Sequence, residues 1–188
     1  MYSTFFKALN SIYALSEEAQ SLILPLIETK SLKKDELILE HDEVCRSFYF
    51  IKSGFARIFY HKNGKEITEW FAPQETFCFS IISFFDETPS NLVIECLEDS
   101  EVVYFGKEGL DILVKQNLEI ANLLMSMYAA SLKLSQIRMD SIQFESAKQR
   151  YERLLELQPQ ILNKVPLHHI ASYLGITAET LSRIRTQL

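Results

Sequence analysis

The chain has 188 residues, of which 47% are hydrophobic and 23% are charged, a balance typical of a soluble globular protein. This length allows one domain of ordinary size and a small second one. The longest nearly apolar run, residues 77–85, is too short to span a bilayer, and the N-terminus lacks the pattern of a signal peptide, so we expect a cytoplasmic protein with no membrane partner. Three scattered cysteines form no CxxC pair, which argues against an iron–sulfur or redox centre.

The net charge of −6 is unevenly distributed along the chain. Residues 145–188 hold six Lys/Arg and four Asp/Glu, a balance of +2, whereas the preceding part has a balance of −8. This pattern disfavours nonspecific nucleic-acid binding by the whole chain and favours one end that faces DNA.

Residues 2–24 show helical periodicity, with Phe5, Leu9 and Ile12 on one stripe. Ser16 is placed to cap a second short helix, because acidic residues follow it in the first turn.

Residues 27–105 change to β-strand signals, with short runs rich in Val, Ile, Phe and Tyr between turn residues. The pair Asn63-Gly64 predicts a two-residue hairpin turn, since both positions favour positive φ. Many short strands indicate a jelly-roll or barrel rather than a parallel sheet. The expected strands cover residues 48–51, 55–60, 67–71, 92–96 and 101–105.

Residues 107–158 are helical again, and the long central helix has two apolar stripes. One stripe, comprising Leu124, Tyr128 and Leu132, is expected to pack on the β-domain, and Phe144 begins a further helix that ends near residue 157. The other stripe alternates by three and four, as in a paired coiled coil, although a helix buried within one chain is the alternative. We expect the dimer seam to comprise Ile120, Leu123, Met127, Ala130, Leu134 and Ile137.

Residues 167–188 are typical of a helix-turn-helix, although an ordinary helical hairpin has the same spacing. Gly175 stands where the chain must turn with positive φ, and Thr177 can cap the second helix. Ala171 permits close approach of the two helices. Leu181, Ile184 and Leu188 are expected to face inward.

A β-roll followed by a long helix and a helix-turn-helix resembles the Crp/Fnr family of bacterial transcription regulators. The segments that carry this resemblance are residues 32–39, 48–54 and 63–66 in the β-roll and 169–184 in the helix-turn-helix. It implies an α+β fold with an N-terminal antiparallel double-stranded β-helix, or jelly-roll, a long dimerisation helix and a C-terminal helix-turn-helix domain. The expected domain boundaries are 1–116, 117–143 and 144–188. The implied partners are double-stranded DNA, a second copy of the chain and RNA polymerase.

Glu179 and Arg183 match family positions that contact base edges, where arginine pairs with guanine and glutamate accepts from cytosine. Ala178 replaces an arginine that is common in the family, so the preferred DNA sequence should differ. The chain also ends without the wing of many relatives, so affinity should depend more on the dimer and on salt. The expected DNA-binding residues are Thr177, Ala178, Glu179, Ser182, Arg183, Arg185 and Thr186.

The family's cyclic-nucleotide pocket uses a Gly-Glu pair and a later arginine, and these align with Phe79-Ser80 and Ser90-Asn91-Leu92. The charged groups are therefore missing, and Gln74 replaces a family glycine nearby. The resemblance leaves a cyclic nucleotide as a candidate effector, but the sequence indicates a pocket that is altered and not specific for cAMP. The expected pocket residues are Phe79, Ser80, Ile81, Ser90, Asn91, Leu92, Ser135 and Gln136.

An enzyme is the first alternative, since β-rolls resemble cupins. His41 and His61 are isolated, and His168 and His169 are adjacent on a helix, which is a poor arrangement for chelation. We therefore expect no catalytic residue, metal, haem or iron–sulfur cluster. The second alternative is a ligand-binding or scaffolding protein of the same fold that has lost DNA binding.

Overall fold

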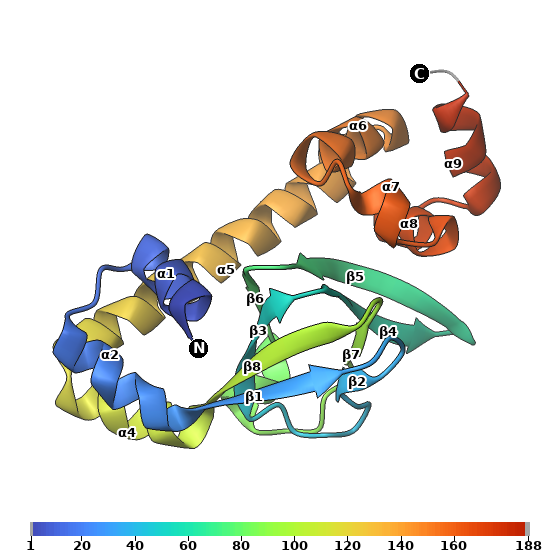
Figure 1. Cartoon of the computed structure of the whole chain (residues 1–188). Helices are drawn as coiled ribbons and strands as arrows, with labels where there is room; N and C mark the ends of the chain where they lie inside the picture. Colours follow the sequence, from blue (N-terminus) through green and yellow to red (C-terminus); the bar gives the residue numbers. More distant parts are fainter. Residues whose placement is uncertain (1, 187–188) are drawn as a thin grey trace.

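A computed structural model describes residues 2–186 and confirms the predicted α+β architecture. Two N-terminal helices precede a β-roll, and a long helix leads to a C-terminal group of short helices (Figure 1). The helices are Ser3–Ile12 (α1), Glu17–Ile23 (α2), Leu24–Leu26 (a short 3-10 turn, η1), Ile81–Asp86 (α3), Lys107–Gln116 (α4), Leu118–Phe144 (α5), Ala147–Leu157 (α6), Ile161–Lys164 (α7), Leu167–Leu174 (α8) and Ala178–Arg185 (α9). None of the helices in this part of the chain is long and apolar enough to cross a membrane.

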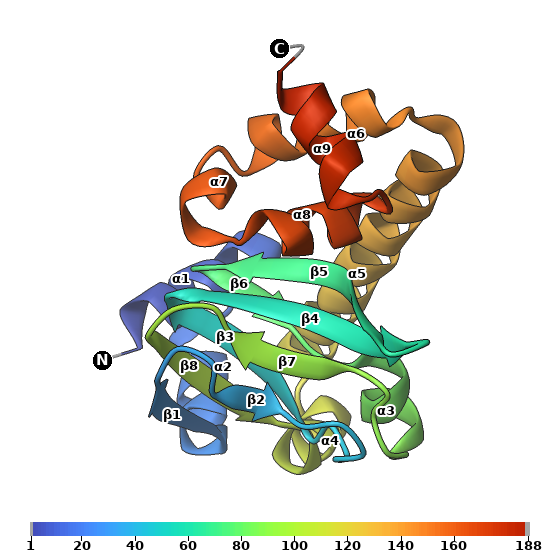
Figure 2. The same ribbon diagram turned by 90° about the vertical axis from the view of Figure 1, so that its right-hand side faces the viewer.

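The β-roll consists of two antiparallel sheets that face each other (Figure 2). One sheet has the strand order β1-β8-β3-β6 and the other β2-β7-β4-β5, so neighbouring strands are distant in sequence, as in a jelly-roll. The strands are Ile27–Leu32 (β1), Leu37–Leu39 (β2), Ser47–Ser53 (β3), Phe55–Lys62 (β4), Lys65–Pro73 (β5), Thr76–Cys78 (β6), Val93–Cys96 (β7) and Ser100–Gly106 (β8).

Local sequence signals explain several turns and caps. Asn63 and Gly64 have φ values of 52° and 71°, as the predicted hairpin between β4 and β5 requires, and Lys62 pairs with Lys65 across it. The Ser16 side chain accepts a hydrogen bond from the Ala19 amide and thereby caps α2.

The core of the β-roll is rich in phenylalanine and extends to the N-terminal helix. Phe5 of α1 is fully buried, with its ring centroid 5.5 Å from that of Phe50 and 5.7 Å from that of Phe105. These edge-to-face contacts attach α1 to the roll.

Helix α5 packs on α4, on α1 and on the core of the β-roll through the face that we had expected to form the dimer seam. Ile120, Leu123 and Met127 are buried within the single chain, so this part of the seam prediction is wrong: these side chains have no free surface for a second copy. Leu132 was expected to contact the roll and is instead exposed. The six-residue pattern failed because both stripes of α5 are apolar, and only tertiary packing decides which one is covered.

The C-terminal helices share a second hydrophobic core with the β-roll. Leu154, Ile170 and Leu181 belong to this cluster, which also includes Phe55 of β4 and Phe71 of β5. Helix α8 lies over the β4–β5 hairpin, and α9 lies farther from the sheets (Figure 2). The helix-turn-helix is therefore docked on the roll of its own chain.

Candidate nucleic-acid interface and ligand cavity

Helices α8 and α9 form a compact pair joined by a tight turn. Gly175 has φ 67°, and its amide donates to the Ser172 carbonyl at 3.0 Å, which ends α8. The Thr177 side chain accepts from the Thr180 amide at 3.2 Å and caps α9, as predicted. Leu181 and Ile184 face inward, whereas Leu188 lies outside the described residues.

The residues expected to contact DNA lie together on the exposed side of α9, opposite the buried Leu181 and Ile184. Arg183 extends along this surface, where its Nη2 donates to Thr180 Oγ1 at 3.2 Å. The pKa of Glu179 is lowered because its carboxylate accepts hydrogen bonds from its own amide and from Thr177. The exposed set is Thr177, Ala178, Glu179, Ser182, Arg183, Arg185 and Thr186.

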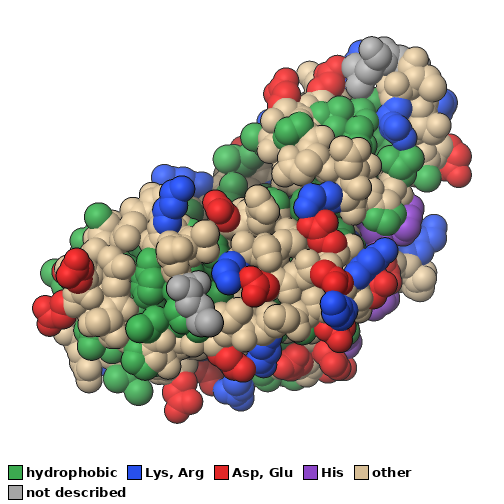
Figure 3. Space-filling model, viewed as in Figure 1, with side chains coloured by type: hydrophobic (Ala, Val, Ile, Leu, Met, Phe, Trp, Pro, Cys, Tyr) green, Lys and Arg blue, Asp and Glu red, His purple; other side chains and the backbone are tan. Residues whose placement is uncertain are grey.

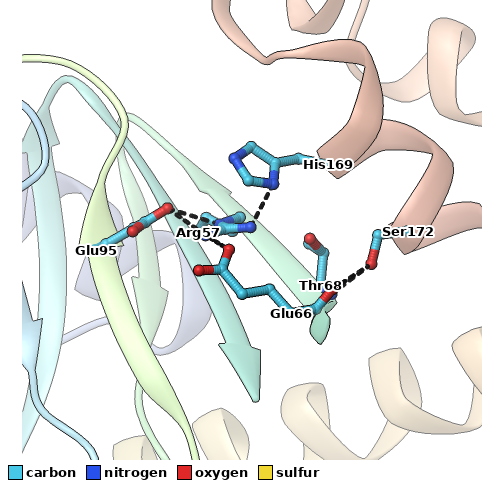
Figure 4. A network of polar contacts seen from close by, with 6 residues as sticks. All are labelled: Arg57, Glu66, Thr68, Glu95, His169 and Ser172. Carbon is cyan, nitrogen blue, oxygen red and sulfur yellow. Dashed lines mark hydrogen bonds and ion pairs between the residues drawn. The ribbon is translucent and has the colours of Figure 1, made fainter. Parts of the chain in front are cut away.

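A polar network attaches α8 to the β4–β5 hairpin (Figure 4). The Thr68 amide donates to Ser172 Oγ at 2.9 Å, and this hydroxyl donates to the Glu66 carbonyl at 3.2 Å. Arg57 of β4 contacts His169 Nδ1 through its Nη1. Because the guanidinium is a donor only, Nδ1 must be the unprotonated nitrogen of that ring.

Arg57 is almost completely buried and is held between two carboxylates. Its Nε donates to Glu95 Oε1 at 2.7 Å, and its Nη2 donates to Glu66 Oε2 at 2.7 Å. Burial raises the pKa of Glu95 more than Arg57 lowers it. In the more exposed Glu66, the hydrogen bond and charge of Arg57 outweigh burial and lower the pKa. The pair Arg57–Glu66 therefore remains ionised near neutral pH.

A cavity of about 880 Å³ lies between the β-roll and the C-terminal half of α5. Gln136 does not line it: one position along α5 from Ser135, it turns away, and its Nε2 donates to Asp140 Oδ1 at 2.8 Å. The expected pocket residues that do line the cavity are Phe79, Ser80, Ile81, Ser90, Asn91, Leu92 and Ser135.

The two segments aligned with the family's phosphate site meet at the inner end of this cavity. Ser80 Oγ and Ser90 Oγ are buried and 2.9 Å apart, and Ser90 Oγ also accepts from the Leu92 amide at 3.0 Å. Phe79 packs against Phe48 with ring centroids 4.5 Å apart. This end of the cavity contains hydroxyls and aromatic rings rather than a cation.

Arg138 of α5 lies between the cavity and α8. It lines the cavity, its Nη2 donates to the Tyr173 carbonyl, and its guanidinium carbon is 3.8 Å from the centroid of the Tyr173 ring. Arg138 therefore connects the cavity wall with the first helix of the helix-turn-helix.

A row of large apolar side chains on α5 remains uncovered in the single chain. Leu118, Met125, Leu132 and Met139 recur every seven residues and are 75%, 68%, 72% and 48% exposed. A strict seven-residue apolar repeat is the pattern of a coiled-coil seam. Of the expected seam, Ala130, Leu134 and Ile137 are also exposed, and Leu134, like Met139 of the heptad row, lines the cavity.

Sequence reasoning missed the heptad row, Arg57 and Arg138. The seven-residue repeat was present in the sequence and could have been found by testing a second heptad register on α5. No sequence signal distinguishes Arg57 or Arg138 from surface arginines, because each has a partner more than thirty positions away that only the fold brings near.

Comparison with known proteins agrees with this geometry. Residues 29–117 match the family model described as the cyclic nucleotide-binding domain. This segment is similar to cyclic nucleotide-binding domains. The chain is also homologous to the cyclic AMP receptor protein of Thermus thermophilus, with 26% identity over 92% of this chain and 82% of that protein.

Solved structures show that most of the chain has the fold of Crp/Fnr regulators. FixK2 from Bradyrhizobium japonicum superimposes with a TM-score of 0.74 and 23% identity, covering 86% of this chain and 84% of that one. A Crp/Fnr-family transcriptional regulator from Eubacterium rectale gives a TM-score of 0.70 and 22% identity, covering 92% and 83%. The resemblance inferred from the sequence is therefore confirmed.

Proposed function

We propose that this cyclic nucleotide-binding-domain protein is a dimeric, sequence-specific DNA-binding transcription regulator of the cytoplasm, which acts on RNA polymerase. The observation that carries the proposal is the exposed face of α9, where Glu179 and Arg183 project beside small polar side chains. Such a face fits the major groove, in which arginine and glutamate distinguish base pairs.

The exposed heptad row supports the dimer in this proposal. Two copies of α5 paired along Leu118, Met125, Leu132 and Met139 would cover these side chains and present two copies of α9. We therefore propose that this heptad row, rather than the seam predicted from the sequence, forms the dimer interface. We also propose that residues 1–116, 117–143 and 144–188 are the sensor, dimerisation and DNA-binding segments.

Selection of bound sequences from a random DNA library tests the proposal. The wild-type protein should enrich a palindromic site, and Arg183→Ala should relax the preference at one position in each half-site, at a cost of about 1–3 kcal/mol. Lys148→Ala, at an exposed position of α6, is the matched control and should keep the DNA sequence preference of the wild type.

The alternative is a ligand-binding or scaffolding protein that has lost DNA binding. If no sequence is enriched even at low salt, where phosphate contacts are strongest, this alternative replaces the regulator.

We further propose that the cavity senses an effector other than cAMP. The hydroxyls of Ser80 and Ser90 hydrogen-bond to each other at the position where a phosphate site needs a cation. Phe79, which packs on Phe48, occupies space that a cyclic phosphate would need. These residues do not fit a cyclic nucleotide. A ligand at one hundred times its Kd should raise the free energy of unfolding by about 2.7 kcal/mol. Millimolar cAMP should leave the melting temperature unchanged, and an increase of several degrees would contradict the proposal.

A further inference from the structure

The wall of the cavity is largely apolar. Trp70, Phe79, Ile82, Leu92, Leu134 and Ile142 contribute to it, and its volume of about 880 Å³ lies within the usual range for small-molecule sites. Such a wall favours a ligand whose body is an aromatic ring or a short acyl chain, because water is released from both surfaces on binding.

Arg138 introduces a cation into this apolar wall. Among the residues that line the cavity, it is the single arginine or lysine, and no ion pair within residues 2–186 involves it. Arg138 donates a hydrogen bond to the carbonyl of Tyr173, and this bond uses one of the five N–H groups of its guanidinium. A partly buried arginine without a carboxylate partner has lost part of its hydration without gaining a counter-charge, so an anionic ligand would bind favourably beside it.

Glu69 limits how much negative charge a ligand can bring. It lines the same cavity, and its pKa is raised, because burial outweighs the opposing charge of Arg138. A second anionic group on the ligand would repel the Glu69 carboxylate or raise its pKa further, whereas a single carboxylate can pair with Arg138.

We propose that the cavity binds a small organic acid, with an apolar aromatic or acyl body among the hydrophobic residues and one carboxylate on Arg138. This inference rests on the proposed sensing role and names the ligand class. Arginine recognises carboxylates through two parallel, charge-assisted hydrogen bonds, which are stronger than bonds to a neutral carbonyl.

Binding at Arg138 would reach the helix-turn-helix directly. The side chain holds the carbonyl of Tyr173 and covers the Tyr173 ring, and α8 precedes the proposed recognition helix by one turn. A carboxylate that draws the guanidinium into the cavity competes with the Tyr173 carbonyl and so weakens the attachment of α8.

Three probes with one apolar body test the ligand class: 4-phenylbutyrate, 4-phenylbutanol and 4-phenylbutylamine. Isothermal titration calorimetry should show that the acid binds at least about tenfold more tightly than the alcohol or the amine. Trp70, the one tryptophan in the chain, lines the cavity, so its fluorescence should change with the same midpoint.

Three variants assign the preference to its cause. Arg138→Gln should reduce the affinity for the acid about tenfold and leave that for the alcohol unchanged. Arg150→Gln is the matched control, since Arg150 donates to the Leu174 carbonyl of α8 at 3.0 Å but does not line the cavity, and it should keep the preference for the acid. Ser135→Phe fills the cavity from the exposed side of α5 and should weaken binding of all three probes, so the test does not depend on the Arg138 variant folding.

Equal affinity for the acid and the alcohol, an acid preference that survives in Arg138→Gln, or no binding of the acid at millimolar concentration would overturn the inference. The titrations contain no DNA, so they are independent of the proposed regulatory role. If the protein bound DNA sequence-specifically but did not bind the acid, only the proposal of an organic-acid ligand would be contradicted. If it bound the acid but no specific DNA sequence, only the proposal of a transcription regulator would be contradicted.

Discussion

Arg57 is the residue whose role depends most on its surroundings, because it is buried between Glu66 and Glu95 and also contacts His169. Removal of one partner from a buried ion pair leaves an uncompensated charge, which costs more than the pair itself contributes.

Arg57→Ala should therefore lower the free energy of unfolding by about 3–5 kcal/mol, because the shielded Glu95 carboxylate loses its counter-charge. Glu66→Gln is the control: the Glu66 side chain is 44% exposed, so its loss should cost about 1 kcal/mol or less. Urea unfolding of the two variants and the wild type measures both values. Equal losses would mean that burial of the carboxylate does not govern the network.

His169 should make stability depend on pH. Burial, followed by the charges of Arg57 and His168, lowers its pKa to about 4, from 6.5 in the unfolded chain. Between these values the unfolded chain binds a proton that the folded chain excludes, so the free energy of unfolding should fall as the pH decreases from 6.5 to 4.

Replacement of His169 by Gln should flatten this part of the pH profile. His168→Gln, at the exposed neighbouring position, should keep most of the slope, because burial and Arg57 are the larger causes of the lowered His169 pKa. Thermal unfolding followed across this pH range makes the comparison. A slope that persists in His169→Gln would assign the effect to another group.

Helix α5 has two apolar faces, one buried within the chain and one exposed. Its buried face includes Met127, and its exposed face includes Leu132, five positions later. The helical periodicity of both stripes is equally clear in the sequence, so only the position of the β-roll distinguishes them.

This difference gives a matched pair of substitutions. Leu132→Glu should convert the proposed dimer to a monomer with little change in the fold of the protomer, because two carboxylates would face each other in the seam. Met127→Glu should instead lower stability by several kcal/mol, because it places a carboxylate in the core. Light scattering and urea unfolding separate the two effects, and a dimer that survives Leu132→Glu would contradict the seam.

Across the whole molecule, the sequence predicted features that depend on near neighbours. The hairpin at Asn63-Gly64, the caps at Ser16 and Thr177 and the turn at Gly175 are correct because each is decided by backbone preferences within a few residues. The landmark segments then supplied the family resemblance and hence the order of the sheets and helices.

Features that depend on distant neighbours were predicted less well. The carried-over positions Ser80 and Ser90 do meet in the cavity, because the two segments that hold them align with family landmarks. Gln136 was misplaced because a one-residue error on a helix rotates the side chain by about 100°. The docking of α8 through Arg57 could not be predicted, because its partners come from three separate strands and helices.

One face of the β-roll carries mixed charges rather than a large basic patch that would bind nucleic acid without regard to sequence (Figure 3). Acidic and basic side chains are interspersed over the visible face of the β-roll (Figure 3). The overall negative charge would oppose a duplex lying along the body of the molecule, which leaves the tip formed by α9 for such contact.

Helix α5 runs without interruption through 27 residues, a length of about 40 Å. Each inserted residue would advance its far end by about 1.5 Å and rotate it by about 100°. If the contacts of α8 with the β-roll were released, one inserted heptad would move the C-terminal helices outward with almost no rotation, whereas two inserted residues would turn them nearly to the opposite side. In the proposed dimer, the number of residues in α5 would therefore affect the half-site spacing that the two copies of α9 could reach.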